Sequence, residues 1–360
     1  MKILFITNLP SPYRVDFFNE LGKHCDLTVI YERHSASDRD KKWVNYNNGE
    51  YKEIYLKNIK IGSDKSFGID LIRYLKKKYF DKVIFCGFSS PAIMIGILYC
   101  RLYHIKYYIE SDGGLFKQEN YIKKRIKRFF LDNCEGVLTT CNEDIKSFHF
   151  LGVDLHKIKK YPFSSVKDED IVSRILTRDE KKCIRKKLGI SEDKVLICVG
   201  QYIKRKGFDL LIKAANRIPD VGIYLIGGRP TDEYLSLKET SGADNIHFVD
   251  FLTKNELMEY YDAGDIFVLP TREDIWGLVI NEAMARALPV ITTDMCNAGL
   301  ELISQGENGY IICSDDVDSL AESVKDAFNS DLEKMSENSL KKIKGYTIEN
   351  MVKQHLKILK

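Results

Sequence analysis

The sequence predicts an α/β protein of two Rossmann-like domains, each with a doubly wound parallel sheet, facing each other across a cleft. Short apolar runs rich in Val, Ile, Phe and Tyr alternate with amphipathic segments, as parallel sheets covered by helices require. A polar, charged stretch over 164–187 interrupts the alternation, and a second series of apolar runs follows it. A length of 360 residues suits two domains better than one.

Each expected strand is placed by its apolar run. The break between the two series predicts domains at 1–165 and 175–345, with a C-terminal helix over 346–360 packing back on the first domain. The expected strands of the first domain are 2–7, 27–32, 53–56, 82–87, 105–111, 136–141 and 158–163, and those of the second are 195–200, 222–228, 246–251, 266–270, 289–294 and 309–313.

Composition excludes several classes of protein. The net charge of +3 is the small difference between 55 basic and 52 acidic residues, which disfavours nucleic acid held by bulk charge. Nine singly scattered cysteines fit free thiols in a reducing compartment. The opening residues fit a first strand rather than a signal peptide, and no stretch reaches the roughly 18 apolar residues of a membrane span. We therefore expect a cytoplasmic protein.

The loop after 195–200 is a candidate anion site. It carries Lys204, Arg205 and Lys206, then Gly207, and it leads into a helical segment whose first N–H groups and dipole favour an anion. Neither a dinucleotide fingerprint nor a P-loop is present, so side chains must help to hold the anion. A solvated basic turn is the alternative.

The loop after 266–270 is a candidate hydroxyl-binding site. Glu273 and Asp274 lie in this loop, and Glu282 follows on the next helix. The spacing across a turn lets Asp274 and Glu282 face one pocket, with Gly277 allowing a ligand to approach the backbone. Carboxylates suit sugar and ribose hydroxyls because each accepts several hydrogen bonds. A helix cap followed by an exposed glutamate is the alternative.

The stretch LPTREDIWGLVINEAMARALPVITTD resembles the donor-site signature of the family 4 retaining glycosyltransferases, in which an acidic residue, seven residues and Glu precede Ala-Met-Ala and a Pro-Val strand. GQYIKRKG is similar to that family's phosphate loop, which usually reads Gly-Arg, four residues, Lys-Gly. The resemblance is strong over 195–313 and weak in the N-terminal half. It implies the GT-B fold, with an acceptor-binding N-terminal domain and a nucleotide-sugar-binding C-terminal domain.

The resemblance implies roles for individual residues. Glu282 would bind the ribose hydroxyls, and Asp274 would bind the transferred sugar. Glu273 is the alternative sugar ligand, because the family usually has Glu at the first acidic position. Lys206 would neutralise the pyrophosphate. The other implied donor contacts are the backbone around Trp276, Gly277 and Leu278, the glycines Gly227 and Gly228, and Glu301.

Two further positions depart from the family pattern. Gln201 stands where the family usually has Arg, and Arg205 is the nearest cation to replace it. In the N-terminal domain the strand over 105–111 leads into Asp112, where the family often has a His. Asp112 is a candidate sugar contact, with a turn-forming role as the alternative. Arg14, in the opening loop, is a candidate contact to phosphate or acceptor.

The implied reaction is a retaining, metal-independent transfer of a sugar from a nucleotide diphosphate, expected to be UDP-linked, to an acceptor hydroxyl. Cations and helix N–H groups would stabilise the departing diphosphate. No bound cofactor or metal is expected, and the Asp38-Arg39-Asp40 motif fits a solvated loop. The expected acceptor is a lipid-linked saccharide in capsule or lipopolysaccharide synthesis. A sugar-nucleotide epimerase of the same fold and a non-catalytic nucleotide-sugar-binding subunit are the alternatives.

The segment 117–132 is a candidate membrane contact. It carries six Lys or Arg against two acids, with Ile122, Ile126, Phe129 and Phe130 at helical spacing. A basic amphipathic helix favours an anionic membrane surface, here the inner face of the cell membrane. An ordinary core-facing helix with a solvated basic face is the alternative.

Overall fold

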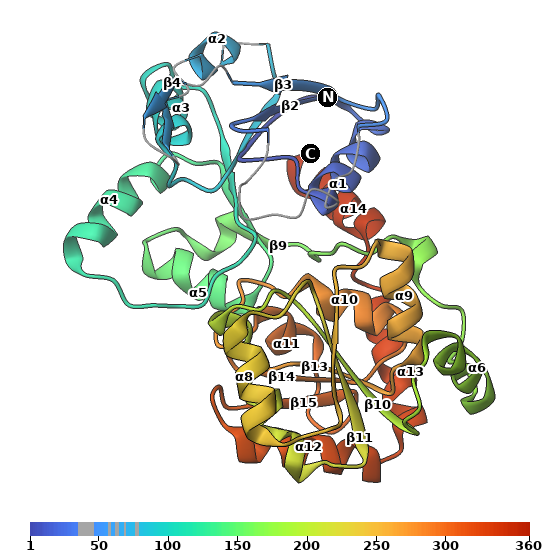
Figure 1. The fold of residues 1–360 in the computed structure, drawn as a ribbon. Helices are drawn as coiled ribbons and strands as arrows, with labels where there is room; N and C mark the ends of the chain where they lie inside the picture. Colours follow the sequence, from blue (N-terminus) through green and yellow to red (C-terminus); the bar gives the residue numbers. More distant parts are fainter. Residues whose placement is uncertain (35–46, 57–58, 62–64, 68–69, 76–78) are drawn as a thin grey trace. The chain divides into compact units, whose positions relative to one another are not determined.

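The computed structural model describes residues 1–34, 47–56, 59–61, 65–67, 70–75 and 79–360. The chain divides into two compact units, which we call the N-terminal unit (Met1–Ser165 with Thr347–Lys360) and the C-terminal unit (Val166–Tyr346). Each unit contains its own parallel sheet with helices packed against it (Figure 1). The predicted fold class, two Rossmann-like α/β units, is confirmed.

The sheet of the N-terminal unit has the strand order β3-β2-β1-β6-β7-β8-β9, and every neighbouring pair is parallel. Sequence order runs outward in both directions from the β1/β6 boundary. This boundary is the topological switch point of the sheet. The strands are β1 (Lys2–Thr7), β2 (Asp26–Tyr31), β3 (Lys52–Tyr55), β6 (Lys82–Cys86), β7 (Tyr108–Glu110), β8 (Gly136–Thr139) and β9 (Ile158–Lys160), with a separate antiparallel pair β4 (Ile59–Ile61) and β5 (Lys65–Phe67).

Helices of the N-terminal unit follow their strands, as right-handed parallel crossovers require. The C-terminal helix α14 packs beside α1, although the two are far apart in the sequence (Figure 1). The helices are α1 (Pro12–Gly22), α2 (Leu71–Tyr74), α3 (Pro91–Leu102), α4 (Tyr121–Leu131), α5 (Asn142–Phe150) and α14 (Ile348–Leu359).

The sheet of the C-terminal unit has the order β12-β11-β10-β13-β14-β15, again all parallel, with its switch point between β10 and β13. Its strands are β10 (Lys194–Val199), β11 (Val221–Ile226), β12 (Ile246–Val249), β13 (Ile266–Leu269), β14 (Val290–Thr293) and β15 (Gly309–Ile312). Its helices are α6 (Arg178–Leu188), α7 (Phe208–Ala214), α8 (Asp232–Ser241), α9 (Lys254–Ala263), α10 (Leu278–Ala285), α11 (Asn297–Leu302), α12 (Val317–Asn329) and α13 (Leu332–Ile343), with the short 3-10 helix η3 (Lys204–Lys206) before α7.

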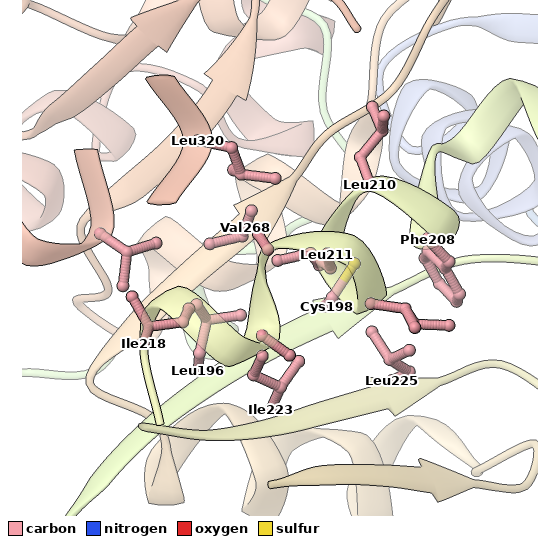
Figure 2. Packing of buried hydrophobic residues seen from close by; sticks show 14 of the residues in the cluster. Leu196, Cys198, Phe208, Leu210, Leu211, Ile218, Ile223, Leu225, Val268 and Leu320 are labelled. Carbon is pink, nitrogen blue, oxygen red and sulfur yellow. The ribbon is translucent and has the colours of Figure 1, made fainter. Parts of the chain in front are cut away.

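The core of the C-terminal unit fixes both ends of the loop between β10 and α7. Leu196 and Cys198 of β10 and Leu211 of α7 are fully buried, and their side chains meet in one apolar cluster (Figure 2). Ile223 of β11 and Phe208 of α7 belong to the same cluster. Since strand and helix are both held by apolar packing, the basic loop between them has fixed end points.

Most of the predicted strands are shorter in the structure, and two of them have half of the expected length or less. The strand predicted over 105–111 extends only over β7 and loses three residues at its start, where the Ile105 N–H still donates to the carbonyl oxygen of Cys100 in the turn after α3. The strand predicted over 158–163 is reduced to β9. The polar stretch 164–187 contains no strand, as expected, but it does contain most of α6. This helix begins with a capping box between Thr177 and Glu180.

Candidate functional site

The switch point between β10 and β13 is where the predicted donor residues lie. In a doubly wound sheet, ligands bind outside the carboxyl ends of the strands at this point. The loop after β10 and the loop after β13 approach each other closely at Gly207. A Cβ at Gly207 would lie 1.9 Å from the carbonyl oxygen of Pro270, and the φ of Gly207 is 73°. Only glycine tolerates both the positive φ and the close approach to Pro270, and its presence lets the two loops pack against each other.

Lys206 and Asp274 form an ion pair across these loops. Lys206 Nζ lies 2.5 Å from Asp274 Oδ2, and the two side chains are only 14% and 13% exposed. The aliphatic stem of Lys206 packs near Gly200, at the end of β10. The structure thus brings together the predicted phosphate-binding cation and the predicted sugar-binding carboxylate. A cation and a carboxylate at one strand edge provide the donors and acceptors that a phosphorylated sugar requires.

Arg205 lies beside this pair. Its NH1 donates to the carbonyl oxygen of Glu273 at 2.7 Å and lies 3.9 Å from Asp274 Oδ1. Almost half of the Arg205 side chain is exposed. Consecutive basic residues therefore both reach the loop after β13, and Glu273 contributes its backbone carbonyl to that contact.

Arg272 was not predicted as a site residue from the sequence, yet its hydrogen bonds connect the loop after β13 with η3 and α7. Its guanidinium bonds both oxygens of Asp209 on α7 at 2.8 Å and the carbonyl oxygen of Lys204 at 2.6 Å. Its backbone N–H donates to the carbonyl oxygen of Arg205 at 2.8 Å. The hydrogen bonds from Arg272 to Asp209 and Asp315 raise its pKa against the opposing effect of burial. The bidentate geometry makes Arg272 a fixed brace between α7, η3 and the β13 loop.

Glu282 lies on α10, partly buried, where its Oε2 accepts a hydrogen bond from the hydroxyl of Tyr261 at 3.2 Å. Asp274 instead contacts the basic loop, so the two carboxylates expected in one pocket have different protein partners. The Trp276 side chain is buried, and its Nε1 donates to Asn281 Oδ1 at 2.8 Å. The Trp276 side chain thus packs against α10 from inside, and its carbonyl oxygen accepts from the Ala298 backbone N–H at 2.8 Å.

The remaining predicted donor residues cluster at the same strand edge. Gly227, after β11, has a φ of 150°, and a Cβ there would lie 1.7 Å from the carbonyl oxygen of Gly200. The absence of a side chain therefore lets the β10 and β11 ends come together. The other members are Gln201 after β10, Gly228 after β11, Gly277 and Leu278 at the start of α10, and Glu301 on α11.

Two apolar side chains near the ion pair are exposed, and the sequence reasoning missed both. Ile203, just before η3, is 39% exposed, and Ile275, just after Asp274, is 54% exposed. Each belongs to a loop that also carries a member of the pair. An isolated exposed isoleucine is common, but two beside one polar site suit a ligand that also has an apolar ring face. The signal in the sequence was an isoleucine within each polar loop.

In the N-terminal unit, Arg14 is buried rather than available to a ligand. Its NH1 donates to Glu110 Oε1 at 2.9 Å, and its NH2 donates to Asp112 Oδ1. Asp112 also accepts from the hydroxyl of Tyr13 at 3.1 Å, and its side chain is 35% exposed. The expected contact of Arg14 with phosphate or acceptor does not match this geometry, since both terminal nitrogens face carboxylates. Asp112 is the exposed end of the network.

Glu110 is the centre of that network. Its Oε1 also lies 3.1 Å from His355 Nε2 on α14, and its Oε2 accepts from the Cys86 thiol at 3.1 Å. Burial raises the pKa of Glu110, but Arg14 and His355 outweigh burial and hold the pKa well below its usual range. Glu110 is therefore a buried anion that connects β7 with α1 and α14.

The basic helix α4 presents apolar side chains to solvent. Tyr121, Ile122, Ile126 and Phe129 are exposed, Ile122 by 70%, whereas Phe130 is buried. Phe130 and Leu131 therefore pack into the N-terminal core, whereas Ile122, Ile126 and Phe129, expected on the same apolar face, remain exposed. The adjacent helix α3 exposes further apolar residues. We call the set Leu98, Leu102, Tyr103, Tyr121, Ile122, Ile126 and Phe129 the α3–α4 surface.

Three further predictions concern membrane spans, metals and thiols. Across the described ranges, no helix is long and apolar enough to cross a membrane. Within the same ranges, His, Cys, Asp and Glu side chains form no group of three or more able to hold a metal ion. The Asp38-Arg39-Asp40 motif lies outside the described residues. All nine cysteines are free thiols, as expected from their scatter.

Two doubly wound units, one of which carries a cationic loop against a carboxylate at its switch point, define the class of GT-B proteins. Residues 180–343 match the family model described as "Glycosyl transferases group 1". The match spans most of the C-terminal unit, so this unit is similar to that family, in agreement with the family predicted from the sequence.

Curated relatives match part of the chain, and a solved structure matches its fold over nearly the whole length. An uncharacterized glycosyltransferase of Haemophilus influenzae is 27% identical over 184 residues, which cover 49% of this chain and 51% of the relative. The lipopolysaccharide core biosynthesis mannosyltransferase LpsB of Rhizobium meliloti is 34% identical over 158 residues, or 40% and 44% of the two chains. The chain thus spans about half the length of these curated relatives. The crystal structure of Anabaena Alr3699/HepE in complex with UDP has a TM-score of 0.80 at 17% identity, covering 99% of both chains.

Proposed function

We propose that this protein is a retaining glycosyltransferase that moves a sugar from a nucleotide diphosphate to an acceptor hydroxyl. The observation that carries the proposal is the Lys206–Asp274 pair at the β10/β13 switch point, inside the family-matched region. The cation suits a diphosphate and the carboxylate suits a sugar hydroxyl. The UDP bound to the Anabaena protein supports a UDP-linked donor for this chain.

The proposed mechanism assigns most of the catalysis to electrostatics. As the glycosidic bond breaks, the diphosphate gains negative charge, and Lys206 and Arg205 are positioned to stabilise it together with the first N–H groups of α10. Asp274, or Glu273 in its place, holds the sugar hydroxyls, and Glu282 holds the ribose. The acceptor attacks from the face that the diphosphate leaves, and the leaving phosphate oxygen takes the acceptor proton. The anomeric configuration is retained.

A panel of nucleotide sugars tests the proposal directly. Thermal shift identifies the donor, because a ligand that binds only the folded state raises the melting temperature by mass action. Release of UDP from that donor into water, and its acceleration by an acceptor, then measures transfer. An epimerised sugar nucleotide in the product would favour the epimerase, and donor binding without turnover would favour a non-catalytic subunit.

Metal independence has its own test. The cationic loop provides the charge that a divalent ion supplies in other glycosyltransferases, so activity is expected to persist in excess chelator. Activity that disappears with chelator and returns with manganese would contradict this part of the proposal and favour the Asp38-Arg39-Asp40 motif.

The α3–α4 surface supports a lipid-linked acceptor. Its exposed apolar side chains lie among Lys123, Lys124 and Arg125, and Arg101 of α3 lies 4.1 Å from the centre of the Phe129 ring. An amphipathic helix of this composition inserts its apolar side chains at the boundary of an anionic bilayer. We propose that the protein is cytoplasmic and binds the inner face of the cell membrane, where it glycosylates a lipid-linked surface saccharide. The role of LpsB in lipopolysaccharide core synthesis supports that class of acceptor.

A further inference from the structure

Asp112 is the exposed end of a charged network that otherwise lies inside the N-terminal unit. Its side chain is 35% exposed, whereas those of Arg14, Glu110 and His355 are 3% exposed or less. Asp112 follows β7 at the carboxyl edge of the sheet, which is the edge where doubly wound folds bind ligands. The network therefore connects buried charges to a position that a ligand can reach.

Two donors hold the Asp112 carboxylate in one orientation. Arg14 NH2 donates to its Oδ1, and the Tyr13 hydroxyl donates to its Oδ2 at 3.1 Å. A carboxylate offers about four lone-pair sites, so both oxygens retain capacity for a further hydrogen bond. Gly113 and Gly114 follow, and neither carries a side chain that could cover the carboxylate. Asp112 can thus accept a ligand hydroxyl without giving up its protein partners.

Glu110 orients Arg14. Arg14 NH1 donates to Glu110 Oε1 at 2.9 Å, while NH2 of the same guanidinium reaches Asp112. Because the guanidinium is planar and rigid, the contact at NH1 sets the direction in which NH2 points. The position of the buried Glu110 carboxylate therefore determines how the exposed Asp112 carboxylate is held.

His355 of α14 fixes Glu110 from the opposite end of the network. Its Nε2 lies 3.1 Å from Glu110 Oε1, and its Nδ1 lies 2.8 Å from the carbonyl oxygen of Met351. Carboxylate and carbonyl oxygens only accept, so both ring nitrogens donate and His355 carries a positive charge. The rings of Phe17 and Tyr161, with centroids 4.7 and 4.4 Å away, pack against the imidazole and fix its plane.

The attachment of α14 to the N-terminal unit does not by itself account for these charges. Moving charged side chains out of water costs free energy that their mutual attraction repays only in part, and apolar residues of similar size would attach the helix at least as well. A row of alternating cations and carboxylates instead gives directional control over the group at its exposed end.

We propose that His355, Glu110 and Arg14 are positioning residues, which hold the Asp112 carboxylate in the orientation that accepts a sugar hydroxyl of a substrate. The proposal rests on the proposed function, because it concerns how a sugar is held for transfer. It gives the last helix a part in the reaction, although 245 positions separate His355 from Glu110 in the sequence.

A double-mutant cycle on the full chain tests the proposal. The probes are UDP-glucose, UDP-galactose, UDP-N-acetylglucosamine and GDP-mannose, and kcat and KM are measured by nucleotide release with the donor that reacts fastest. Asp112→Asn removes the charge of that side chain and keeps its shape. His355→Gln retains one donor for Glu110, and His355→Leu retains none. Leu359→Ala, at a buried position one turn further along α14, is the matched control for weaker helix packing.

We expect Asp112→Asn and His355→Leu each to lower kcat/KM about tenfold or more, and His355→Gln to keep part of the activity that His355→Leu loses. In the Asp112→Asn background, replacing His355 should cost little more, because His355 acts only through Asp112. Leu359→Ala should lower Tm and leave kcat/KM unchanged. Should the His355 variants fail to fold, Arg14→Lys takes their place in the cycle, since lysine keeps the charge but cannot span both carboxylates.

Additive losses from the Asp112 and His355 changes, or wild-type kcat/KM in His355→Leu, would overturn the proposal. A loss in Leu359→Ala as large as that in His355→Leu would also overturn it, because the effect would then come from helix packing. In each of these cases the wild-type protein still turns over its donor, so the proposed function stands. If wild type turns over none of the four donors, the proposed function and the positioning role fail together.

Discussion

Lys206 Nζ and Asp274 Oδ2 lie 2.5 Å apart although 68 positions separate the two residues in the sequence. They meet because β10 and β13 are neighbours in the sheet and Gly207 allows their loops to touch. In this contact each charge is partly neutralised by the other. A diphosphate sugar would exchange this contact for phosphate on Lys206 and hydroxyl on Asp274. The pair is therefore the centre of the predicted donor site.

The first prediction concerns the two cations beside Asp274. Lys206→Ala and Arg205→Ala are each expected to lower turnover by about 10²–10³, the usual cost of removing one transition-state donor. The double variant should lose less than the product of the two, because both cations serve one anion. Steady-state kinetics with the identified donor measures this, with Lys213→Ala on α7 as the control. If Arg205→Ala turns over at the wild-type rate, Arg205 is a solvated turn residue that does not stabilise the diphosphate.

The second prediction separates nucleotide from sugar binding. Glu282→Ala is expected to weaken binding of the nucleotide itself by about 1.5–3 kcal/mol, the value of a charge-assisted hydrogen bond. Asp274→Ala should mainly lower turnover of the intact sugar donor. Calorimetry with UDP and kinetics with the UDP-sugar distinguish the two effects. Glu273→Ala is the matched control. Loss of turnover in that variant alone would show that Glu273, and not Asp274, binds the sugar.

The third prediction concerns the α3–α4 surface. Replacing Ile122 and Ile126 by Ser should release the protein from vesicles that contain phosphatidylglycerol, because these exposed side chains can enter the bilayer. Changing Lys123, Lys124 and Arg125 to Gln should weaken the same binding by about 1 kcal/mol per charge. Sedimentation with vesicles measures both, and donor hydrolysis should stay normal. Leu155→Ser, an exposed apolar residue elsewhere in the N-terminal unit, is the control.

If the Ile122/Ile126 variant sediments with anionic vesicles as well as wild type does, α4 does not contact the membrane. Equal binding to neutral phosphatidylcholine vesicles would contradict the electrostatic part of the prediction, since the cations would then contribute nothing.

The fourth prediction is a pH dependence of stability. Burial raises the pKa of Asp144 from 3.8 to about 6, against opposing hydrogen bonds from Thr139 and Ser111. Because the folded-state pKa is the higher one, the contribution of Asp144 to stability is complete below about pH 4 and is lost as pH rises through about 6. The loss amounts to about 2–3 kcal/mol.

Asp144→Asn should remove this dependence. The free energy of unfolding of this variant, relative to that of wild type, should therefore increase as the pH rises from about 4 to about 7. Urea unfolding across this range measures the difference. Asp132→Asn, at an exposed carboxylate, should run parallel to wild type. A difference between wild type and Asp144→Asn that does not change with pH would show that Asp144 titrates normally.

Much of the fold was predictable because its signals are local. Strands such as β1, β10 and β11 are continuous apolar runs buried on both faces, and such runs stand out in any sequence. The strand over 105–111 was overestimated mainly at its start. There the Ile105 N–H donates to the carbonyl oxygen of Cys100 in the turn after α3, a contact that the apolar pattern does not show.

The sequence indicated which residues belong to the candidate donor site, but it did not indicate which of their side chains contact each other. Lys206, Asp274 and Glu282 were found from the loops that follow two strands, and each loop is contiguous in the sequence. Arg272 was missed, because its partners Asp209 and Asp315 come from α7 and from the loop after β15. Arg14 was assigned to a ligand, because its ion-pair partner Glu110 is far away in the sequence and no local pattern indicates that the two residues meet.

Periodicity and short contiguous motifs were enough to place the two doubly wound units and to single out the loops of the candidate donor site. Long-range packing, by contrast, sets which charges pair and which apolar side chains remain exposed. Lys206 meets Asp274, Arg14 is buried against Glu110, and Ile122 faces solvent because of strand order and helix orientation. Those features arise from contacts between segments far apart in the chain, and no local pattern encodes them.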